Sequence, residues 1–236
     1  MEEGRRAVWQ VMVTSKRVLG QEHPDTLTKM DNLGSTYWDQ GRWKGAEELF
    51  VQVMETRKRV LGQEHPDTLT SMGNLASTYQ GQGRWEEAEE LFVQVMETRK
   101  RVLGHEHPDT LTSMSNLAST YLNQGRWKEA EELGVQVMGT RKRGLGQEHP
   151  DTLTSMSNLA STYWSQGQWK EAEGLSVQVM ETRKRVLGQE HPDTLTNMGS
   201  LASTYWARGD GRRLKDCLCR SWRREGGYSA KSIQMP

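Results

Sequence analysis

The sequence predicts an all-α fold, a solenoid of antiparallel helix hairpins, and three observations support that prediction. A 42-residue unit recurs along most of the 236-residue chain. Apolar residues within each unit fall at helical spacing, in two stripes separated by a short polar break. The chain has only two cysteines and no long apolar run, so neither a disulfide framework nor a membrane span organises it.

The repeat is clearest in the string H-P-D-T-L-T, whose copies are 42 residues apart and begin at His23, His65, His107, His149 and His191. A period of roughly 20 to 50 residues is typical of stacked supersecondary units, none of which can bury its apolar face alone. We therefore expect residues 20–209 to hold four complete hairpins followed by one unpaired first helix.

Each unit contains two expected helices, which the second copy illustrates. The first begins at Pro66 and Asp67, residue types that favour a first turn, and ends near Gly83. It carries one apolar stripe, made of Leu69, Met72, Leu75, Ala76 and Tyr79. The second begins near Trp85, with acidic residues early and basic residues late, as the helix dipole favours. Gly104 is expected to form a left-handed C-cap, and the short loop after it makes successive helices antiparallel.

Residues 1–19 align with the second helix of a unit, with Val11, Met12 and Leu19 in register. We expect this segment to belong to a truncated repeat, because no first helix precedes it in the sequence. The chain is then part of a longer array or a truncated gene product. Self-association through its uncapped ends is a further expectation.

The motifs resemble a known family. A small residue three positions before the tyrosine, followed by glycine, an aromatic residue and alanine, is similar to the tetratricopeptide signature. The 42-residue length and the strings N-L-A-S-T-Y, E-A-E-E-L and L-G-Q-E-H-P-D-T resemble the kinesin light chain type of this repeat. The resemblance covers residues 5 to 209. It implies a right-handed superhelical solenoid whose concave face, lined by the first helices, binds peptides.

Comparison between the units indicates where a ligand would bind. Most positions are nearly identical, but the first helices differ at a few sites that, by similarity to the family, face the concave groove. Variable side chains on a constant frame suit a specificity surface. We expect Asn32, Asn74, Asn116 and Asn158 to bond a peptide backbone, beside the variable Trp38, Gln80, Leu122, Trp164 and Trp206. The alternative is that these positions are solvent-exposed and drift freely. Trp43, Trp85, Trp127 and Trp169, in contrast, are expected to pack between hairpins.

Catalytic and cofactor-binding motifs are absent from the sequence, so we expect no enzyme, no cofactor and no metal site. Five of the six histidines are the same loop residue, expected to cap helices, and no H-E-x-x-H spacing occurs around His105 and His107. The 31 basic residues balance 31 acidic ones, which favours neither a nucleic-acid nor a membrane partner. A protein or peptide partner in the cytoplasm is the expectation.

Residues 210–236 depart from the repeat, and we expect them to be a frameshifted, disordered tail. One choice of codons, shifted by a single nucleotide, translates as R-W-K-E-A-E-G-L-S-V-Q-V-M-E-T, the expected next unit. Cys217, Cys219 and Trp222 then carry no selected function. The last first helix would lose its partner and expose Leu201, Tyr205 and Trp206.

Some units look eroded. Gly134, Gly139 and Gly144 replace larger residues, each at a cost of roughly 1 kcal/mol in helix propensity. Gly134 and Ser176 also stand where other units have phenylalanine, a loss of about 3 kcal/mol in packing. We expect residues 128–145 to be the least stable part of the array.

The leading functional prediction is a protein–protein interaction scaffold that binds a peptide or helix in its groove. Two alternatives remain open from the sequence. The chain could be the sensor or regulatory repeat fragment of a larger signalling ATPase, or a truncated product with no selected role. An upstream P-loop in the same gene would favour the first alternative, and an upstream coiled coil would favour an adaptor like kinesin light chain.

Overall fold

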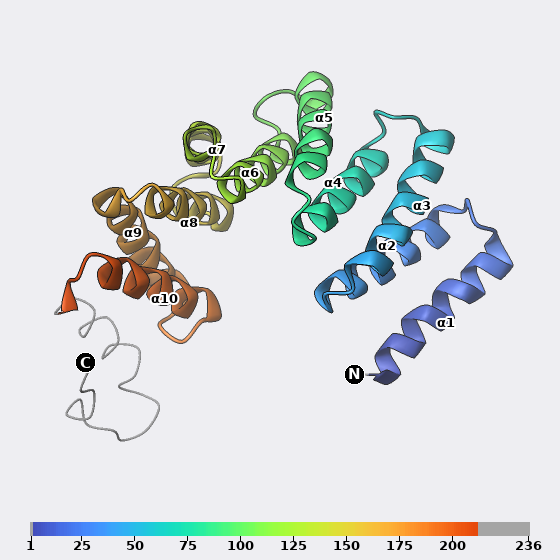
Figure 1. Ribbon diagram of the computed structural model, residues 1–236, viewed down its shortest axis with the longest axis horizontal. Helices are drawn as coiled ribbons and strands as arrows, with labels where there is room; N and C mark the ends of the chain where they lie inside the picture. The colour runs from blue at the N-terminus through green and yellow to red at the C-terminus, as the bar shows by residue number, and fades with distance from the viewer. Residues whose placement is uncertain (1, 212–236) are drawn as a thin grey trace. The chain divides into compact units, whose positions relative to one another are not determined.

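The computed structural model describes residues 2–211, and the side chains of residues 9–211 (Figure 1). Every regular element in this range is a helix, and no strand occurs in it. The helices are α1 (Glu2–Leu19), α2 (Pro24–Asp39), α3 (Trp43–Leu61), α4 (Pro66–Gly81), α5 (Trp85–Leu103), α6 (Pro108–Asn123), α7 (Trp127–Leu145), α8 (Pro150–Ser165), α9 (Trp169–Leu187) and α10 (Pro192–Ala207). First helices have 16 residues, and the second helices of the complete hairpins have 19.

The chain divides into two compact units, residues 1–125 and residues 126–236. In the first unit each helix contacts the next from α1 to α6, and in the second unit from α7 to α10. This succession of neighbouring helices confirms the predicted all-α repeat solenoid. The expected frameshifted tail, with Cys217, Cys219 and Trp222, lies outside the described residues from position 212 onward.

Each first helix begins with the same cap, because H-P-D supplies its three parts in order. At the start of α6, His107 Nδ1 accepts a hydrogen bond of 3.2 Å from the backbone N–H of Asp109, and Pro108 occupies the first turn. The other four first helices repeat this bond at His23, His65, His149 and His191. The capping role predicted for the five repeated histidines is confirmed.

The second helices end at glycine, but in a different conformation from the one predicted. Gly104 has φ 93° and ψ 165°, whereas a left-handed cap would have a ψ of about 47°. Such an extended conformation with positive φ is readily available only to glycine. The chain therefore leaves α5 along an extended path toward the next histidine cap.

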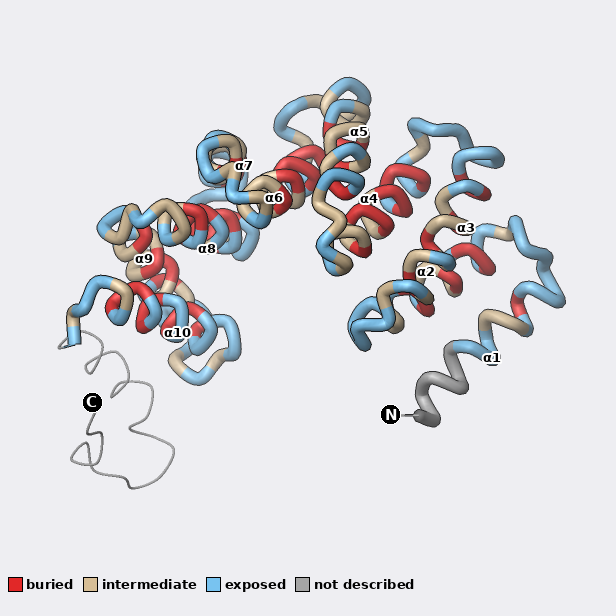
Figure 2. Tube along the Cα trace, in the orientation of Figure 1, coloured by how far each residue is buried: buried red, intermediate tan, exposed pale blue. Residues whose placement is uncertain are grey.

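Within each unit the core lies between a first helix and the second helices that pack against it, as at α2, α4 and α8. In the first unit Ala46, Phe50 and Leu75 form one buried cluster from α3 and α4. Phe50 packs closely against Gly34, where an added Cβ would lie 2.7 Å from the Phe50 ring. Figure 2 shows the result, with buried residues along α4 and α8 and exposed residues in the loops.

The second unit keeps its helices although its core lacks phenylalanine. α7 runs unbroken through Gly134, Gly139 and Gly144, and α9 runs through Ser176. Leu153, Met156 and Val179 still form a buried cluster between α8 and α9. The lower stability expected for residues 128–145 stays a prediction, since it concerns energy rather than helix bounds.

The last first helix, α10, is better covered than the sequence suggests. The predicted exposure of Leu201 and Tyr205 is wrong, because their exposed fractions are only 3% and 8%. Both belong to a cluster against which Val177 and Met180 of α9 pack. The preceding second helix therefore buries this face. Trp206, at 72%, is exposed as expected.

Candidate functional site

Each complete hairpin places one arginine of its second helix against the first helix that follows. Arg57 of α3 donates from Nη1 to Ser71 Oγ at 2.7 Å and to the Asp67 carbonyl at 3.4 Å, both in α4. The same pairing recurs as Arg99–Ser113, Arg141–Ser155 and Arg183–Asn197, at 2.9, 2.8 and 2.5 Å. A guanidinium group is thus built into the packing between consecutive helices of each unit.

Arg57 has a carboxylate partner as well. Asp31 Oδ2 of α2 lies 2.5 Å from Arg57 Nη1, and the two side chains are only 14% and 8% exposed. Burial raises the pKa of the Asp31 carboxyl, and the nearby Arg57 guanidinium offsets part of that rise. Burial also lowers the pKa of Arg99, an effect that Asp109 partly opposes. Burial removes water from these guanidinium groups, so hydrogen-bond acceptors within the protein must replace it.

This arrangement was not predicted from the sequence, in which the arginines stand out only as basic residues late in a helix. A signal was present in the repeat. The residue 14 positions after Arg57, Arg99 and Arg141 is serine, and after Arg183 it is asparagine. At the first equivalent position the roles are exchanged, and Lys29 Nζ donates to Ser15 Oγ at 2.6 Å.

The second unit contains a pocket of about 460 Å³ lined by α8, α9 and α10. Asn158 and Trp164, two of the predicted groove residues, line it together with Ser157, Ser176 and Arg183. Hydroxyl and amide groups make up most of the remaining wall. The pocket therefore offers many hydrogen-bonding groups, one cation and one aromatic face.

Two of the predicted groove tryptophans, Trp38 and Trp164, contact the tryptophans that begin the second helices. Trp38 meets Trp43 edge-on with 5.5 Å between ring centroids, and Trp164 meets Trp169 in the same way at 5.8 Å. Trp38 Nε1 also donates to the Ser77 carbonyl of the next first helix at 3.3 Å. Trp38 and Trp164 remain more than one-third exposed, so each combines a fixed orientation with an accessible face.

The helix-start tryptophan Trp43 packs between hairpins, as predicted. A Cβ at Gly81, at the end of α4, would lie 2.8 Å from the Trp43 ring. Trp127 is more open, with 43% of its surface exposed.

The other predicted groove positions differ in accessibility. Asn32 and Asn158 are exposed, whereas Asn74, Asn116, Gln80 and Leu122 are half-buried. Gln80 Nε2 donates to Thr120 Oγ1 at 3.2 Å, which links α4 to α6. Burial raises the pKa of the Asp31 carboxyl, and a side-chain hydrogen bond with Asn74 offsets part of that rise. Gln80 and Asn74 therefore also take part in contacts within the scaffold.

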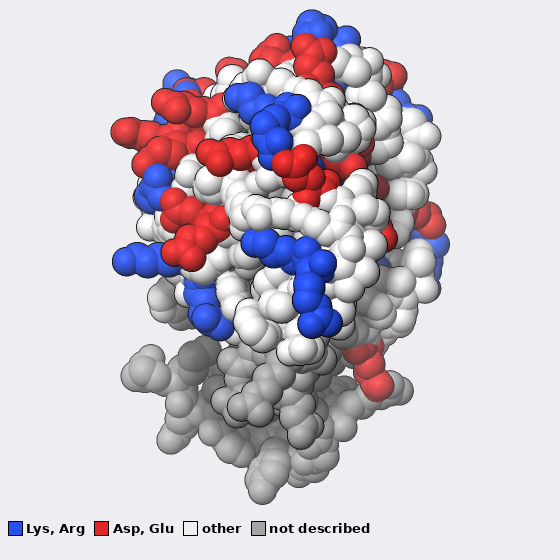
Figure 3. Space-filling view, turned by 90° about the vertical axis from the view of Figure 1, so that its right-hand side faces the viewer, with Lys and Arg blue, Asp and Glu red and all other residues white. Residues whose placement is uncertain are grey.

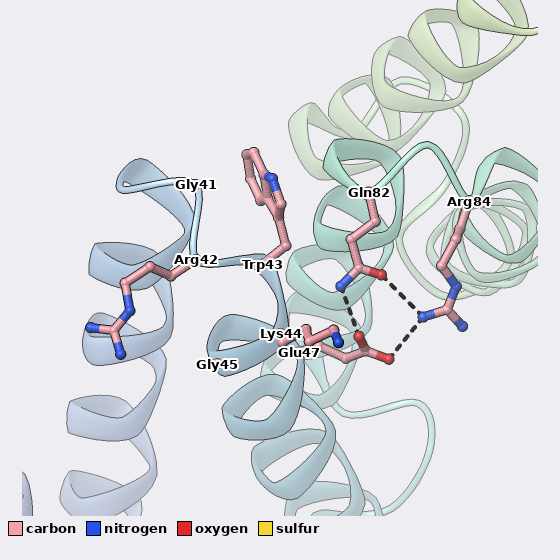
Figure 4. A pocket seen from close by; sticks show the side chains of 8 residues that line it. All are labelled: Gly41, Arg42, Trp43, Lys44, Gly45, Glu47, Gln82 and Arg84. Carbon is pink, nitrogen blue, oxygen red and sulfur yellow. Dashed lines mark hydrogen bonds and ion pairs between the residues drawn. The ribbon is translucent and has the colours of Figure 1, made fainter.

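A second hollow, of about 770 Å³, lies at the junction of α3 and α4 (Figure 4). Glu47 accepts hydrogen bonds from Gln82 Nε2 at 2.7 Å and from Arg84 Nη1 at 2.9 Å. Arg42 points away from this network. The pairs Gln124–Glu89 and Gln166–Glu131 repeat the first bond at 2.8 and 2.9 Å. This hollow is therefore the surface of a repeated connection between hairpins.

The charges show no single-sign surface on the face drawn in Figure 3, where basic and acidic side chains are interspersed. Among the described residues, no three histidine, cysteine, aspartate or glutamate side chains gather into a group that could hold a metal ion. None of the described helices is long and apolar enough to cross a membrane.

Known proteins match this repeat directly. A family model for the tetratricopeptide repeat matches residues 25–101 and 67–143, and a second one matches residues 152–193. The nearly identical TPR-like repeats of a candidate kinesin light chain from Podosopora anserina have a similar crystal structure. It is 36% identical, with a TM-score of 0.72 over 84% of this chain and 94% of that chain. The chain belongs to the tetratricopeptide repeat family.

Other solved tetratricopeptide-like structures also have a similar fold. A singly substituted form of the Podosopora anserina repeats is 35% identical, with a TM-score of 0.73 over the same shares of the two chains. BtubC (BKLC) from P. vanneervenii has a TM-score of 0.78 over 100% of this chain and 97% of that chain, at 19% identity, and shows a likeness of fold alone. A search of curated proteins finds no significant match.

These comparisons confirm the resemblance to kinesin light chain-like tetratricopeptide repeats. They also support a protein–protein interaction role for the chain, since tetratricopeptide proteins are generally non-enzymatic scaffolds.

Proposed function

We propose that the chain binds an extended peptide or a helix of a partner protein along the face lined by its first helices. The observation that carries the proposal is the pocket between α8 and α10, which brings Asn158 and Trp164 together. Trp164 and Ser157 are positions at which the units differ, whereas Asn158 has an asparagine equivalent in most units. A pocket of this composition combines constant backbone recognition with variable side-chain recognition.

The chemistry of the lining suits a polypeptide ligand. An asparagine side chain can donate to a carbonyl and accept from an N–H, as a peptide backbone requires. Trp164 and Trp206 are large exposed aromatic side chains of the second unit, and such residues often supply most of the binding energy at interfaces. A Rap protein with a TM-score of 0.68 and 11% identity has been solved in complex with Competence and Sporulation Factor.

We propose the same role in the first unit for Asn32, Trp38, Asn74, Gln80, Asn116 and Leu122. Their half-buried members would contribute mainly by orienting the exposed ones. A cytoplasmic location and the lack of a catalytic activity also belong to the proposal.

The test is selection of random displayed peptides on the full-length chain, followed by affinity measurements on variants. We expect Trp164→Ala and Asn158→Ala to weaken a selected peptide, the first by roughly 30-fold. Trp127→Ala is a matched control, because Trp127 is 43% exposed and Trp164 is 42% exposed. Unchanged affinity in both groove variants, or an equal loss in the control, would contradict binding at this face.

A further inference from the structure

Arg57 and Arg183 are equivalent arginines of the second helices, and they differ in whether a carboxylate pairs with them. Arg57 has Asp31, at 2.5 Å in a nearly buried position. The positions equivalent to Asp31 in the following units are Gly73, Ser115 and Ser157. The chain therefore shows, in one hairpin, where a carboxylate sits when it pairs with this arginine.

Arg183 in the second unit has only neutral acceptors. Its Nη1 donates to Asn197 Oδ1 at 2.5 Å and to the Asp193 carbonyl at 3.4 Å. Asn197 Nδ2 in turn donates to Ser157 Oγ at 3.2 Å. Within residues 9–211, no carboxylate pairs with Arg183. A partly buried guanidinium without a counter-charge favours an anion that can replace lost solvent.

Space for that anion exists at the same place. Arg183, Asn197 and Ser157 all line the α8–α10 pocket of about 460 Å³. Ser176, at the position of Phe50 and Phe92, also lines it, so a small side chain stands where other hairpins fill their core. The pocket thus places the Arg183 guanidinium, which has no carboxylate partner, beside space that a ligand can occupy.

We propose that this pocket binds an aspartate or glutamate side chain of the partner peptide, with its carboxylate placed against Arg183 as Asp31 is placed against Arg57. This inference rests on the proposed peptide-binding function and names the chemistry of its ligand. In the first hairpin Asp31 occupies the carboxylate position beside Arg57. In the second unit the equivalent residue is Ser157, whose shorter side chain leaves the position beside Arg183 available to a ligand.

The most direct test introduces a carboxylate of the protein itself beside Arg183. Ser157→Asp copies Asp31 into the second unit and should neutralise Arg183 from within, while Ser157→Asn is the neutral control of similar size. Random peptides of about 12 residues, displayed so that none has a free C-terminal carboxylate, are selected on the full-length wild-type chain. We expect an enriched acidic residue, and a loss of affinity of roughly tenfold or more in Ser157→Asp and Arg183→Gln.

Control variants and peptides distinguish failure of the carboxylate site from failure of peptide binding as a whole. Ser157→Asn should bind within about threefold of the wild type, and a glutamine in place of the enriched acid should cost as much as Arg183→Gln does. Selected peptides that depend on Trp164 but not on an acid, Arg183 or Ser157→Asp would overturn the inference and leave the peptide groove standing. Failure to select any peptide would count against the proposed function.

A small probe tests the carboxylate site without any peptide. N-acetyl-glutamate methylamide is titrated into isotope-labelled full-length chain, with N-acetyl-glutamine methylamide as the neutral match. We expect the Asn197 side-chain amide signal to move only with the glutamate probe, and not in Ser157→Asp. Equal shifts with both probes would refute a carboxylate site. Circular dichroism of each variant establishes that the helices are retained.

Discussion

Ser176 offers the most direct test of how this array holds together. Its equivalents Phe50 and Phe92 are 2% and 1% exposed, and both are among the largest fully buried side chains of the chain. Ser176 is itself 4% exposed, so a core position is occupied by a small polar residue. Replacing it with phenylalanine restores the packing that the first unit has.

The expected gain in stability follows from the apolar surface that the phenylalanine side chain would bury. Full burial of a phenylalanine side chain contributes about 1.5–3 kcal/mol, and we expect Ser176→Phe to stabilise the second unit by about 2 kcal/mol. Steric room is indicated by the repeat itself. Ala76 is equivalent to Gly34, and the hairpin that contains Ala76 accommodates Phe92. The hairpin that contains Ser176 also has alanine at this position, Ala160, so a phenylalanine at 176 should fit in the same way.

Amide hydrogen exchange is the suitable assay, because stability in a repeat array is local and a single unfolding midpoint can miss it. A gain of about 2 kcal/mol should slow exchange in α8, α9 and α10 by roughly 30-fold. Phe92→Ser is the matched reverse change and should speed exchange in α4 and α5, with a loss of about 3–5 kcal/mol. Unchanged or faster exchange in Ser176→Phe would refute the idea that the second unit is underpacked.

Four further predictions concern single substitutions. His107→Ala should cost about 1 kcal/mol and speed exchange in the first turn of α6, whereas His107→Asn should keep the cap; equal effects would contradict capping by Nδ1. Gly104→Ala should cost about 1–3 kcal/mol in thermal unfolding, because its φ is 93°. Gly73→Ala, at a helical site with nothing within 4 Å, should instead stabilise by up to about 1 kcal/mol, and a loss there would be unexpected. Because burial raises the pKa of Asp31, the folded chain binds that proton more tightly than the unfolded chain, and stability falls as the pH rises through the raised pKa. Asp31→Asn should remove this slope above about pH 4 in urea unfolding, and a retained slope would assign it to another group.

The sequence by itself determined the helices and their order. His-Pro-Asp specifies each first-helix start through contacts between residues two positions apart, and Gly104 and its equivalents end the second helices. Such local signals survive without knowledge of the rest of the chain. Even here the glycine backbone conformation differed from the prediction, because it depends on where the next helix lies.

Only the tertiary structure decided which polar groups meet across helices. Arg57 and Asp31 are 26 residues apart and Asn197 and Ser157 are 40 apart, and neither pairing follows from helical spacing. Burial of Leu201 and Tyr205 likewise depends on α9 packing against α10, which a count of hairpins did not anticipate. Repetition along the sequence specifies which elements form, whereas the side chains that differ between units act through contacts that exist only after the helices stack.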